Sequence, residues 1–579
     1  MQNGISKTKA IVFSVMVLLV AAGFGYIYFA KRKLSPQTAA RSASPIDITP
    51  LLVAKLQSLV LQSSDSLYHL TIEQLQPDIL ASQVQAFHIS LIPDSAVLLT
   101  LDRAKKAPDD VFTLSFDTLR ITGINAIDFL HKKDIRLDTI FLSSPRITIA
   151  HASRPYNAAI RKQDSSMTLY QKLTQQFTSL HIGAIIAKDG NVVSTDLSRS
   201  NATTRLSNVS IQVSDIAIDS LTQHDTSRFF FSKAADFTCR DYTATSDDSL
   251  YTFRLGSVSV SADQHQLVIK DLILEPKGGK AAFQRKLKTR NDMFTLHFPR
   301  IVATQVDWWA LVNRQSLYAG NIAIDGGLVK DYFDRTPPRS GKPTRKDNYP
   351  HQMLARLPFP VLVEKVDVKG LDVVYEEYNP DIHRSGTVSF NAISGNISNI
   401  TNVASRIKAL PQATSSLAGQ FMNKVPITAS FGFNLARART GAFTARFHLG
   451  AVPGALLNTV AEPLGLYTLK SGNTEETNVS ISGDNYTATT GITMLYHNLS
   501  IYPLKVTSDG KTKEMKLVGF LANTLGIKNA NPSGKEAPRS PEVHVVRDKT
   551  GGSFFNFVWQ CVLTGIVKSV GLPKKLAEP

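Results

Sequence analysis

Hydrophobic and polar residues alternate with a period of two along most of this chain. Because successive side chains of a strand point to opposite faces, such runs predict strands with one apolar face. The clearest runs contain Phe112, Leu114 and Phe116; Val209, Ile211 and Val213; Val258 and Val260; Leu267 and Ile269; and Val366 and Val368. Helical spacing is rare, with the clearest examples at residues 51–61 and 167–180. The sequence therefore predicts a mostly β protein with short helical inserts, and not an α/β fold.

Four of the runs share a change of phase. Alternation stops, two mostly polar residues intervene, and alternation resumes after a step of three residues. The steps are Phe116 to Leu119, Val213 to Ile216, Ile269 to Leu272 and Val368 to Leu371. A step of three reverses the apolar face of an ideal strand, whereas a β-bulge restores it. The pattern favours long, bent strands that keep one apolar face, and the alternative is a tight turn at each step.

Part of the chain repeats itself. Residues 112–149, shifted by 182 positions, align with residues 294–331 without a gap. FTLSF at 112–116 then meets FTLHF at 294–298, and the apolar positions continue to match up to the ends of both segments. Each copy has the order strand, short helix or loop, strand. Repeated units of this kind each leave an apolar face that must find cover.

Residues 10–30 are a run of 21 residues without a charge. As a helix this run is about 31 Å long, which matches the hydrocarbon core of a bilayer. A cleaved signal peptide is the rival interpretation, but the run is longer than a signal h-region and no small-x-small site follows it directly. We therefore expect an uncleaved transmembrane anchor. Its membrane-facing residues are Ile11, Val12, Phe13, Val15, Val17, Leu18, Leu19, Val20, Tyr26 and Tyr28.

Basic residues stand on both sides of the expected anchor. Lys7 and Lys9 precede it, and Lys31, Arg32 and Lys33 follow it. The positive-inside rule counts such residues near the membrane. Here the rule weakly disfavours an orientation in which the body of the protein lies outside the cytoplasm, so it does not determine the orientation of the chain.

The C-terminal region predicts a second apolar helix. Helix start and stop signals stand at Ser553 and at Gly571, which Pro573 follows. Between them, Asn556, Gln560, Thr564 and Lys568 fall at four-residue steps and form one narrow polar stripe. Such a helix suits a membrane interface, the cover of an apolar groove, a packing position inside the protein or, less readily, a bilayer crossing. The residues expected at a membrane are Phe554, Phe557, Val558, Trp559, Val562 and Ile566.

Composition narrows the range of functions. The 579 residues include 64 basic and 47 acidic ones, a net charge of +17, which suits an anionic membrane surface or nucleic acid. No basic stripe with interleaved aromatic residues is present, which argues against nucleic-acid binding. Two cysteines, Cys239 and Cys561, are too few for a disulfide framework. Cys239 lies in an alternating segment and is expected in an apolar core.

Searches for catalytic motifs find none. HExxH, CxxC, GxSxG and the phosphate-binding GxxxxGK[ST] pattern are missing from the sequence, and the thirteen histidines are scattered. The carboxylate pairs Asp247-Asp248 and Glu376-Glu377 are neighbours that point to opposite faces of a strand, so solvated edges are expected there. The sequence therefore predicts no catalytic residue, no metal ligand and no cofactor, and it favours a binding or structural protein over an enzyme.

Changes in composition suggest where the chain divides. We expect a tail at 1–9, the anchor at 10–30, a linker and short helix at 31–65, a first β segment with the repeat at 66–332, a basic Pro-rich loop at 333–352, a second β segment at 353–530, a linker at 531–552, the amphipathic helix at 553–571 and a tail at 572–579.

Several stretches resemble the AsmA-like family, relatives of TamB in the repeating-β-groove lipid-transfer superfamily, and most of all its Bacteroidota members. They are the anchor at 10–30, FTLSFDTLRITGINAIDFLHKKDIRLDTIFLSSPRITI (112–149), VEKVDVKGLDVVYEEYNPDIHRSGTVSFNAISGNISNITN (363–402), ATTGITMLYHNLSIYPLKV (488–506) and residues 531–571. The resemblance implies an elongated, curved, taco-like groove of antiparallel strands after a transmembrane helix. It also implies an inner-membrane anchor with a cytoplasmic N-terminus, a periplasmic body, and a role in phospholipid transport or outer-membrane homeostasis within the cell envelope.

The implied partners are phospholipids, the inner membrane through the N-terminal helix, and the outer membrane or a partner protein through the C-terminal helix. The strand pattern agrees, because a sheet with one apolar face and no partner sheet must cover that face. Acyl chains can do so and gain about 0.8 kcal/mol per buried methylene. The expected groove residues are Phe112, Leu114, Phe116, Val209, Ile211, Val213, Phe294, Leu296, Phe298, Val366 and Val368. The alternative is a structural envelope-assembly protein whose β body packs against itself and transports no ligand.

Overall fold

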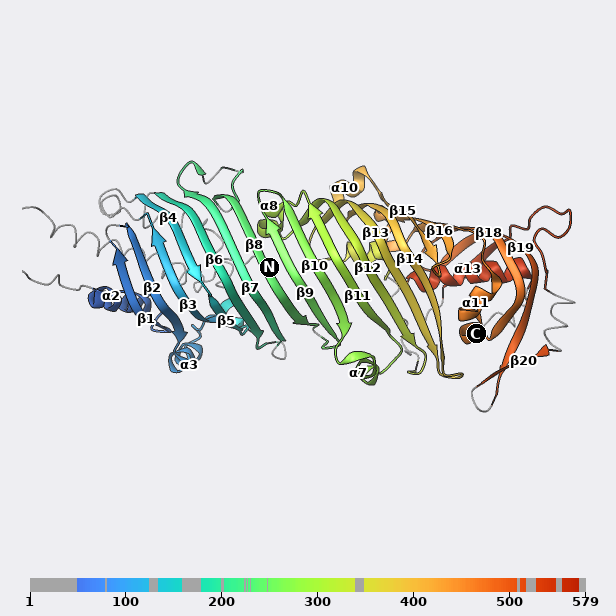
Figure 1. The fold of residues 1–579 in the computed structure, drawn as a ribbon, viewed down its shortest axis with the longest axis horizontal. Coiled ribbons are helices and arrows are strands. Elements are labelled where there is room, and N and C mark those ends of the chain that lie inside the picture. Colours follow the sequence, from blue (N-terminus) through green and yellow to red (C-terminus); the bar gives the residue numbers. More distant parts are fainter. Residues whose placement is uncertain are drawn as a thin grey trace, which may run out of the picture. The chain divides into compact units, whose positions relative to one another are not determined.

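Strands dominate the computed structural model, as the alternation predicts (Figure 1). The structure describes residues 49–571 apart from 79–80, 124–133, 159–178, 199–201, 223–224, 226, 230, 247, 339–347, 508–510, 517–526 and 548–553. The expected anchor at 10–30, the tail at 572–579 and most of the helix expected at 167–180 lie outside these residues. Within the described part of the chain, none of the helices combines the length and apolarity that a bilayer crossing requires.

The strands are β1 (Tyr68–Asp78), β2 (Gln83–Pro93), β3 (Asp110–Thr122), β4 (Asp134–Ser143), β5 (Arg146–His151), β6 (Ser179–Asp196), β7 (Ala202–Ile218), β8 (Ser232–Thr245), β9 (Tyr251–Ser261), β10 (Gln266–Pro276), β11 (Asp292–Thr304), β12 (Leu317–Asp334), β13 (Val361–Asn379), β14 (Arg384–Thr401), β15 (Gln412–Phe421), β16 (Val425–Asn434), β17 (Phe443–Leu449), β18 (Tyr467–Gly483), β19 (Thr487–Val506), β20 (Thr512–Glu514) and β21 (Glu542–Val546). The helical elements are α2 (Thr49–Ser63), α3 (Ser95–Arg103), η1 (Pro155–Ala158), α7 (Gly279–Lys286), α8 (Trp308–Arg314), α9 (Pro350–Ala355), α10 (Ala404–Ala409), η4 (Leu435–Thr440), α11 (Gly454–Val460), η5 (Ala461–Gly465) and α13 (Phe554–Val570).

The 21 strands belong to one mixed sheet. Antiparallel neighbours prevail, but β6 runs parallel to β4 and β5, and β13 runs parallel to β12. The purely antiparallel arrangement implied by the family resemblance is therefore corrected. Each parallel junction follows a long connection in the sequence, residues 152–178 and 335–360, and a parallel pair requires a connection of about this length.

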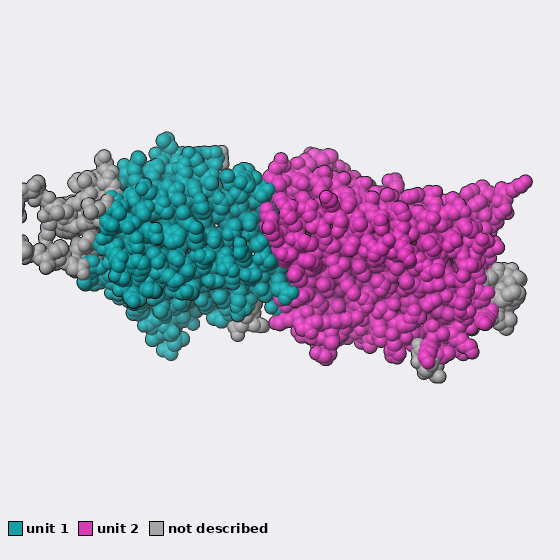
Figure 2. All heavy atoms as spheres, in the orientation of Figure 1, with its two compact units in different colours: residues 1–249, 253–267 teal, residues 250–252, 268–579 magenta. Residues whose placement is uncertain are grey.

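Contacts within the chain divide it into two units, residues 1–249 with 253–267 and residues 250–252 with 268–579 (Figure 2). The expected boundary at 333–352 does not separate them. β12 before this segment and β13 after it are hydrogen-bonded neighbours, from Leu317 with Val361 to Asp334 with Tyr378. The segment therefore falls inside the second unit. The expected linker at 531–552 also contains a strand, β21, which pairs with β19.

The internal repeat is confirmed and is longer than the sequence alignment indicates. The elements that correspond are β1 and β9, β2 and β10, α3 and α7, β3 and β11, β4 with β5 and β12, β6 and β13, and β7 and β14. Their first residues differ by 182 positions for Asp110 and Asp292 and by 184 for Ser95 and Gly279. The pairing repeats as well, because Leu114 faces Ile147 in the first copy as Leu296 faces Val329 in the second.

All four phase steps lie inside continuous strands, in β3, β7, β10 and β13, so the tight-turn alternative is wrong. Residues with positive φ stand within three of the steps, at Asp215 (52°), Asp271 (51°) and Gly370 (69°). The register with the neighbouring strand shifts at the last of them, between Val368 and Leu371, which confirms a bulge there.

At the step from Phe116 to Leu119, β3 keeps its register with the neighbouring strand in a different way. The rows that cross these strands are Ile72–Ile89–Phe116 and Leu75–Ala86–Leu119. Each of the three strands thus takes a step of three between the same two rows. Because β1, β2 and β3 change phase together, the apolar face continues without a register shift.

The first unit closes much of its apolar face with its own helices. Leu56 and Val60 of α2 are buried in a core with apolar residues of β1, β2, β3, β4, β6 and β7. Val97, Leu98 and Leu101 of α3 pack against the same core. The helical spacing of residues 51–61 is confirmed, and its apolar side covers the sheet.

In the second unit, α13 covers the C-terminal strands. Phe554, Phe557 and Cys561 are buried in a core with Val479 of β18 and Ile492 of β19. A Cβ atom added to Gly565 would lie 2.9 Å from the Ile492 side chain, so the helix backbone approaches the sheet as closely as glycine allows.

This packing predicts opposite outcomes for two adjacent phenylalanines. Phe554 is 2% exposed and its ring lies 5.0 Å from that of Phe443, whereas Phe555 is 63% exposed. Phe554→Ala is expected to lower the free energy of unfolding by about 3–5 kcal/mol, because it leaves a cavity in the core. Phe555→Ala is expected to change it by roughly 0.5 kcal/mol or less. Urea unfolding followed by circular dichroism measures both, and equal losses would contradict the observed orientation of α13.

Candidate apolar binding face

One ladder of paired residues crosses the second unit from β11 to β19 and is apolar at every position. It comprises Ile301, Ile324, Val368, Gly395, Leu417, Ala429, Phe447, Val479 and Ile492. Side chains opposite each other across a strand pair lie on the same face. The ladder therefore defines one apolar face of the second unit, which alternation predicts but whose order along the sheet only the pairing reveals.

The opposite face is polar along the next ladder. Asn396, Ser416, Ser430, Arg446, Ser480, Gly491 and Glu542 follow one another from β14 to β21. These residues line a hollow of about 760 Å³ that is open to water, together with residues of the apolar ladder such as Leu417 and Phe447. The two faces of the same strands thus differ sharply, so an apolar ligand has a single face to bind.

Cover on the apolar face is uneven. Under α13, Val479 and Ile492 are 6% and 1% exposed. Between β11 and β15 most of the apolar residues on this face are half-buried, although Val366 and Val368 of β13 are each 7% exposed. We define eight of the half-buried residues as the apolar floor: Leu296, Ile301, Ile324, Val329, Leu371, Val373, Ile393 and Leu417. In the described part of the chain, the cores that contain helices include none of them.

Helices bound the apolar floor on two sides. At one end of the strands, α11 packs with Phe421, Val388 and Phe390, and the η5 residue Leu464 occupies the space above Gly386. Toward β16, α13 exposes Phe555 and Trp559 on the flank that its buried residues leave free. The ring of Phe555 lies 6.3 Å from that of Phe431 in β16. The apolar surface therefore continues from the floor onto the side of α13.

The expected groove residues fall into three groups. Phe112, Leu114, Phe116, Val209, Val366 and Val368 are buried; Val213, Leu296 and Phe298 are half-buried; and Ile211 and Phe294 are exposed. Leu114 and Phe116 belong to the core that α2 and α3 cover, so they contact protein and are not free to line a groove. Of the expected groove residues, Leu296 is the one that belongs to the apolar floor. Ile301 of β11 and residues of β12, β13, β14 and β15 complete it, and the sequence analysis named none of these as groove residues.

The expected membrane residues of the C-terminal helix also divide. Phe554, Phe557 and Val558 are buried against the sheet, which corrects their assignment to a membrane, because α13 uses this side to cover β17–β19. Val562 and Ile566 are half-buried. Trp559, at 43% exposure, is the residue of the six that remains free to contact a membrane or a ligand.

Three carboxylates interrupt the apolar face near one end of the floor. Asp292, Asp331 and Glu377 come from β11, β12 and β13, on the face that also carries Leu296 and Val329. Tyr375 donates a hydrogen bond of 2.7 Å to Glu377, and Arg335 forms an ion pair with it. Glu377 is 12% exposed, so the solvated edge expected for this residue is wrong. The sequence could not show this, because Asp331 and Glu377 meet only through the parallel pairing of β12 and β13.

Burial shifts the proton equilibria of this group. It raises the pKa of Asp331 to about 7, with smaller contributions from the negative charges of Asp292 and Glu377. It raises the pKa of Asp292 to about 6, with Glu377 adding to the effect. One carboxylate oxygen of Asp331 is buried without a hydrogen-bond partner among the described residues. A protonated Asp331 is therefore the form that best suits this apolar surrounding.

The described residues contain no group of three or more histidine, cysteine or acidic side chains placed to hold a metal ion. Cys239 and Cys561 are buried thiols, and burial raises the pKa of Cys561 to about 11. Such a thiol is a poor nucleophile at neutral pH. What this face offers chemically is an apolar surface that water contacts and that a nonpolar ligand can cover.

A scan against protein-family models gives no match, and no curated protein matches the sequence. The family resemblance therefore remains an expectation.

The carboxylates predict a pH dependence of stability. The folded-state pKa of Asp331 lies above its usual 3.8, so the folded protein binds a proton more tightly than the unfolded chain. The contribution of Asp331 to the free energy of unfolding is therefore most favourable at low pH, and it is lost as the pH rises from about 4 to about 7. Asp331→Asn is expected to reduce the fall in melting temperature between pH 5 and pH 8 by about 2 °C or more.

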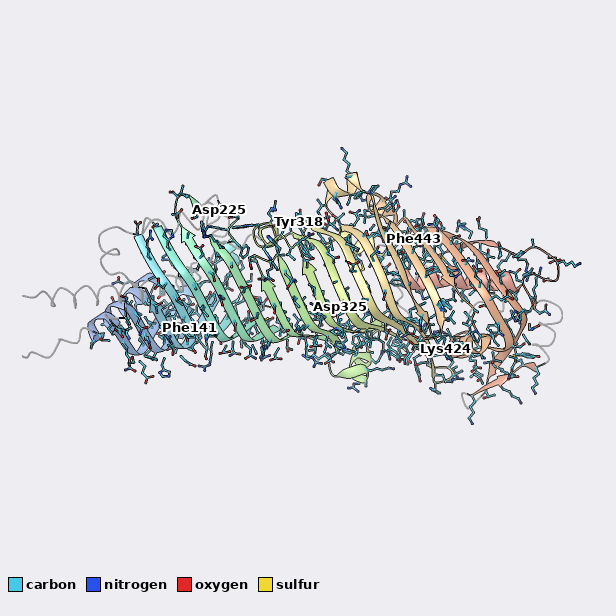
Figure 3. All side chains as sticks on the ribbon, turned by 45° about the horizontal axis from the view of Figure 1, so that its top comes forward. Phe141, Asp225, Tyr318, Asp325, Lys424 and Phe443 are labelled. Carbon is cyan, nitrogen blue, oxygen red and sulfur yellow. The ribbon has the colours of Figure 1, made fainter. Side chains whose placement is uncertain are left out.

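The matched control is Asp325→Asn, in the same strand. Asp325, labelled in Figure 3, has a side chain that is 43% exposed. Its carboxylate lies 2.8 Å from Arg300. This variant should show the same fall in melting temperature as the original protein. Thermal unfolding at both pH values provides the measurement, and a fall in Asp331→Asn as large as in the original protein would refute the role of the buried carboxylates.

Proposed function

We propose that the protein binds the acyl chains of phospholipids on the apolar floor of its second unit. The observation that carries this proposal is the apolar floor, whose eight residues share one face between β11 and β15, are half-buried, and belong to none of the helix-containing cores of the described residues. Apolar side chains that water contacts across several neighbouring strands are typical of a binding site. Its removal from water stabilises a complex by about 25 cal/mol per Å².

The dimensions of the floor support a lipid over a compact ligand. Five strands, β11 to β15, span four spacings of about 4.8 Å, or about 19 Å, which is comparable with an extended acyl chain. The floor has no arrangement of polar groups that would orient a small polar molecule, apart from the carboxylates at one end. An acyl chain needs no such groups, since the hydrophobic effect is non-directional.

The wider role follows from the family resemblance and forms part of the proposal. In this proposal the floor belongs to a curved β-groove that residues 10–30 anchor in the inner membrane, with the body in the periplasm. The protein then takes part in phospholipid transport between membranes or in outer-membrane homeostasis. The net charge of +17 supports contact with anionic lipid surfaces.

The core of the first unit favours a second candidate function. There, α2 and α3 close the apolar face with side chains of the chain itself. A protein that packed its whole apolar face in this way would be a structural component of envelope assembly without a ligand. The half-buried floor in the second unit is the feature that this alternative leaves without an explanation.

Adjacent residues of β15 test the proposal. Leu417 lies on the apolar floor, whereas Ser416 is exposed on the opposite face. Leu417→Asp is expected to lower the amount of phospholipid that co-purifies with the full chain by roughly tenfold, because a carboxylate on the floor opposes burial by an acyl chain. Ser416→Asp adds the same charge to the same strand and should leave the lipid content unchanged. Lipid mass spectrometry of the purified proteins measures both.

Circular dichroism and thermal unfolding establish that each variant is folded. Leu296→Asp, with Thr295→Asp as its control, repeats the comparison in β11, where the two residues again lie on opposite faces. Lipid that is present in equal amount in all four variants, or that is lacking in the unmodified protein, would reject acyl-chain binding and leave the structural alternative.

A further inference from the structure

Three short helical elements of the second unit lie at the same end of the strands. We call this end of the strands the edge of the sheet. α9 precedes the start of β13, α10 lies between the end of β14 and the start of β15, and η4 follows the end of β16. In Figure 1, α10 stands at this edge, beside the ends of β13 and β15. The turn between β15 and β16, at residues 422–424, marks the opposite edge, where Figure 3 labels Lys424.

Hydrogen bonds join these elements into one structure. Asn402 donates to the carbonyl groups of Leu354 and Phe359, at 3.2 and 3.0 Å, which connects the start of α10 to α9. Gln352 of α9 donates to the carbonyl of Ala438 in η4 at 2.8 Å. The amide of Leu435 donates to the carbonyl of Pro411 at 2.8 Å. The three elements therefore hold fixed positions relative to one another.

α9 has one side in the protein and another in water. His351 and Gln352 are each 3% exposed, and the ring of His351 packs 5.2 Å from Phe433. Outside, Met353, Leu357 and Phe359 are exposed, together with Leu410 at the end of α10. We call these four residues the edge patch. Their exposed fractions run from 37% for Phe359 to 57% for Met353, so the patch is apolar surface in contact with water.

Positive charge surrounds the edge patch. Residues 350–360, 402–411 and 434–441 contain five basic side chains and no acidic one. Arg406 contacts Glu364 at 3.8 Å. The other four, Arg356, Lys408, Arg437 and Arg439, have no ion-pair partner among the described residues. The nearest turn contributes Asp484, whose carboxylate accepts hydrogen bonds from the amides of Tyr486 and Thr487.

From this arrangement we infer that the edge patch docks on the surface of a membrane that contains anionic lipids. Apolar side chains that project from a fixed edge enter the boundary between headgroups and acyl chains, while the surrounding cations contact lipid phosphates. Stable attachment of this kind needs both signals, because either one alone binds weakly and reversibly. The patch supplies both within three short elements.

The pattern of charges favours an anionic membrane surface over a protein as the partner of the edge patch. Each basic residue near an anionic bilayer adds to its attraction, and the four unpaired cations have no acidic neighbour in the three segments to oppose them. A second copy of the chain would bring the same positive charges together, which disfavours self-association through this edge. The inference does not depend on the occupant of the apolar floor, since it rests on a different set of residues.

A fluorescent label placed in the edge patch tests the inference in the full chain. The native cysteines are buried, so an environment-sensitive dye attached through Leu357→Cys reports on the patch alone. The protein is held in phosphatidylcholine nanodiscs, which occupy any anchoring segment, and vesicles that carry a nitroxide-labelled lipid are then added. Quenching and a blue shift are expected with vesicles of phosphatidylcholine and phosphatidylglycerol, and much less with phosphatidylcholine vesicles alone. The same dye at Lys424→Cys, on the opposite edge, should not respond.

Charge reversal provides the second comparison. Arg437→Glu combined with Arg439→Glu is expected to reduce the ratio of bound to free patch by roughly tenfold or more. Lys424→Glu combined with Arg446→Glu changes the net charge equally, but away from the patch, and should leave the ratio almost unchanged. Circular dichroism of each variant verifies folding.

Three results would overturn membrane docking at this edge. The first is an equal response of the labels at residues 357 and 424, and the second is a response that does not depend on lipid charge. The third is a change in dye emission that grows with protein concentration when no vesicle is present, which would assign the patch to self-association. If the patch docks while the Leu417→Asp protein still co-purifies with as much lipid as the Ser416→Asp protein, membrane docking stands and acyl-chain binding on the floor fails.

Discussion

An apolar sheet face in water is the constraint on which this structure depends. Strands that alternate apolar and polar residues pair so that whole ladders, such as the one from Ile301 to Ile492, are apolar from end to end. Hydrogen bonds between strands satisfy the backbone but leave this face without cover. The protein covers parts of it with α2 and α3 in one unit and with α13 and α11 in the other. The floor between β11 and β15 is a part that the cores formed by the described helices do not include.

The same constraint explains the positions of the charged groups. Arg446 and His448 lie on the polar face, where they remain exposed. Asp292, Asp331 and Glu377 lie on the apolar face, where burial raises the pKa of both aspartates. Carboxylates in such a place are neutralised by protons or by partners such as Arg335. The end of the floor is therefore the place where its surface changes from apolar to polar.

Sequence reasoning located the strands and their apolar sides because alternation is a local property. Phe112, Leu114 and Phe116 share a face of β3, and the stop and start signals around α13 gave a helix within a residue of its observed bounds. Cover is not local. Leu114 belongs to the core that also contains α2, whereas Leu417 is half-buried, and this difference depends on residues far apart in the chain. The meeting of Asp331 with Glu377 depends likewise on a parallel junction, which the alternation of the two strands does not encode.

The repeat has a consequence for how such a protein changes in size. One repeat period, from β1 to the strand before β9, holds seven strand positions with β4 and β5 as one, and these contribute about 34 Å of sheet at the usual strand spacing. Duplication of a segment of this length would add whole strands and leave the existing ladders in register. A change of this kind would add or remove sheet in fixed increments, without redesign of any single strand.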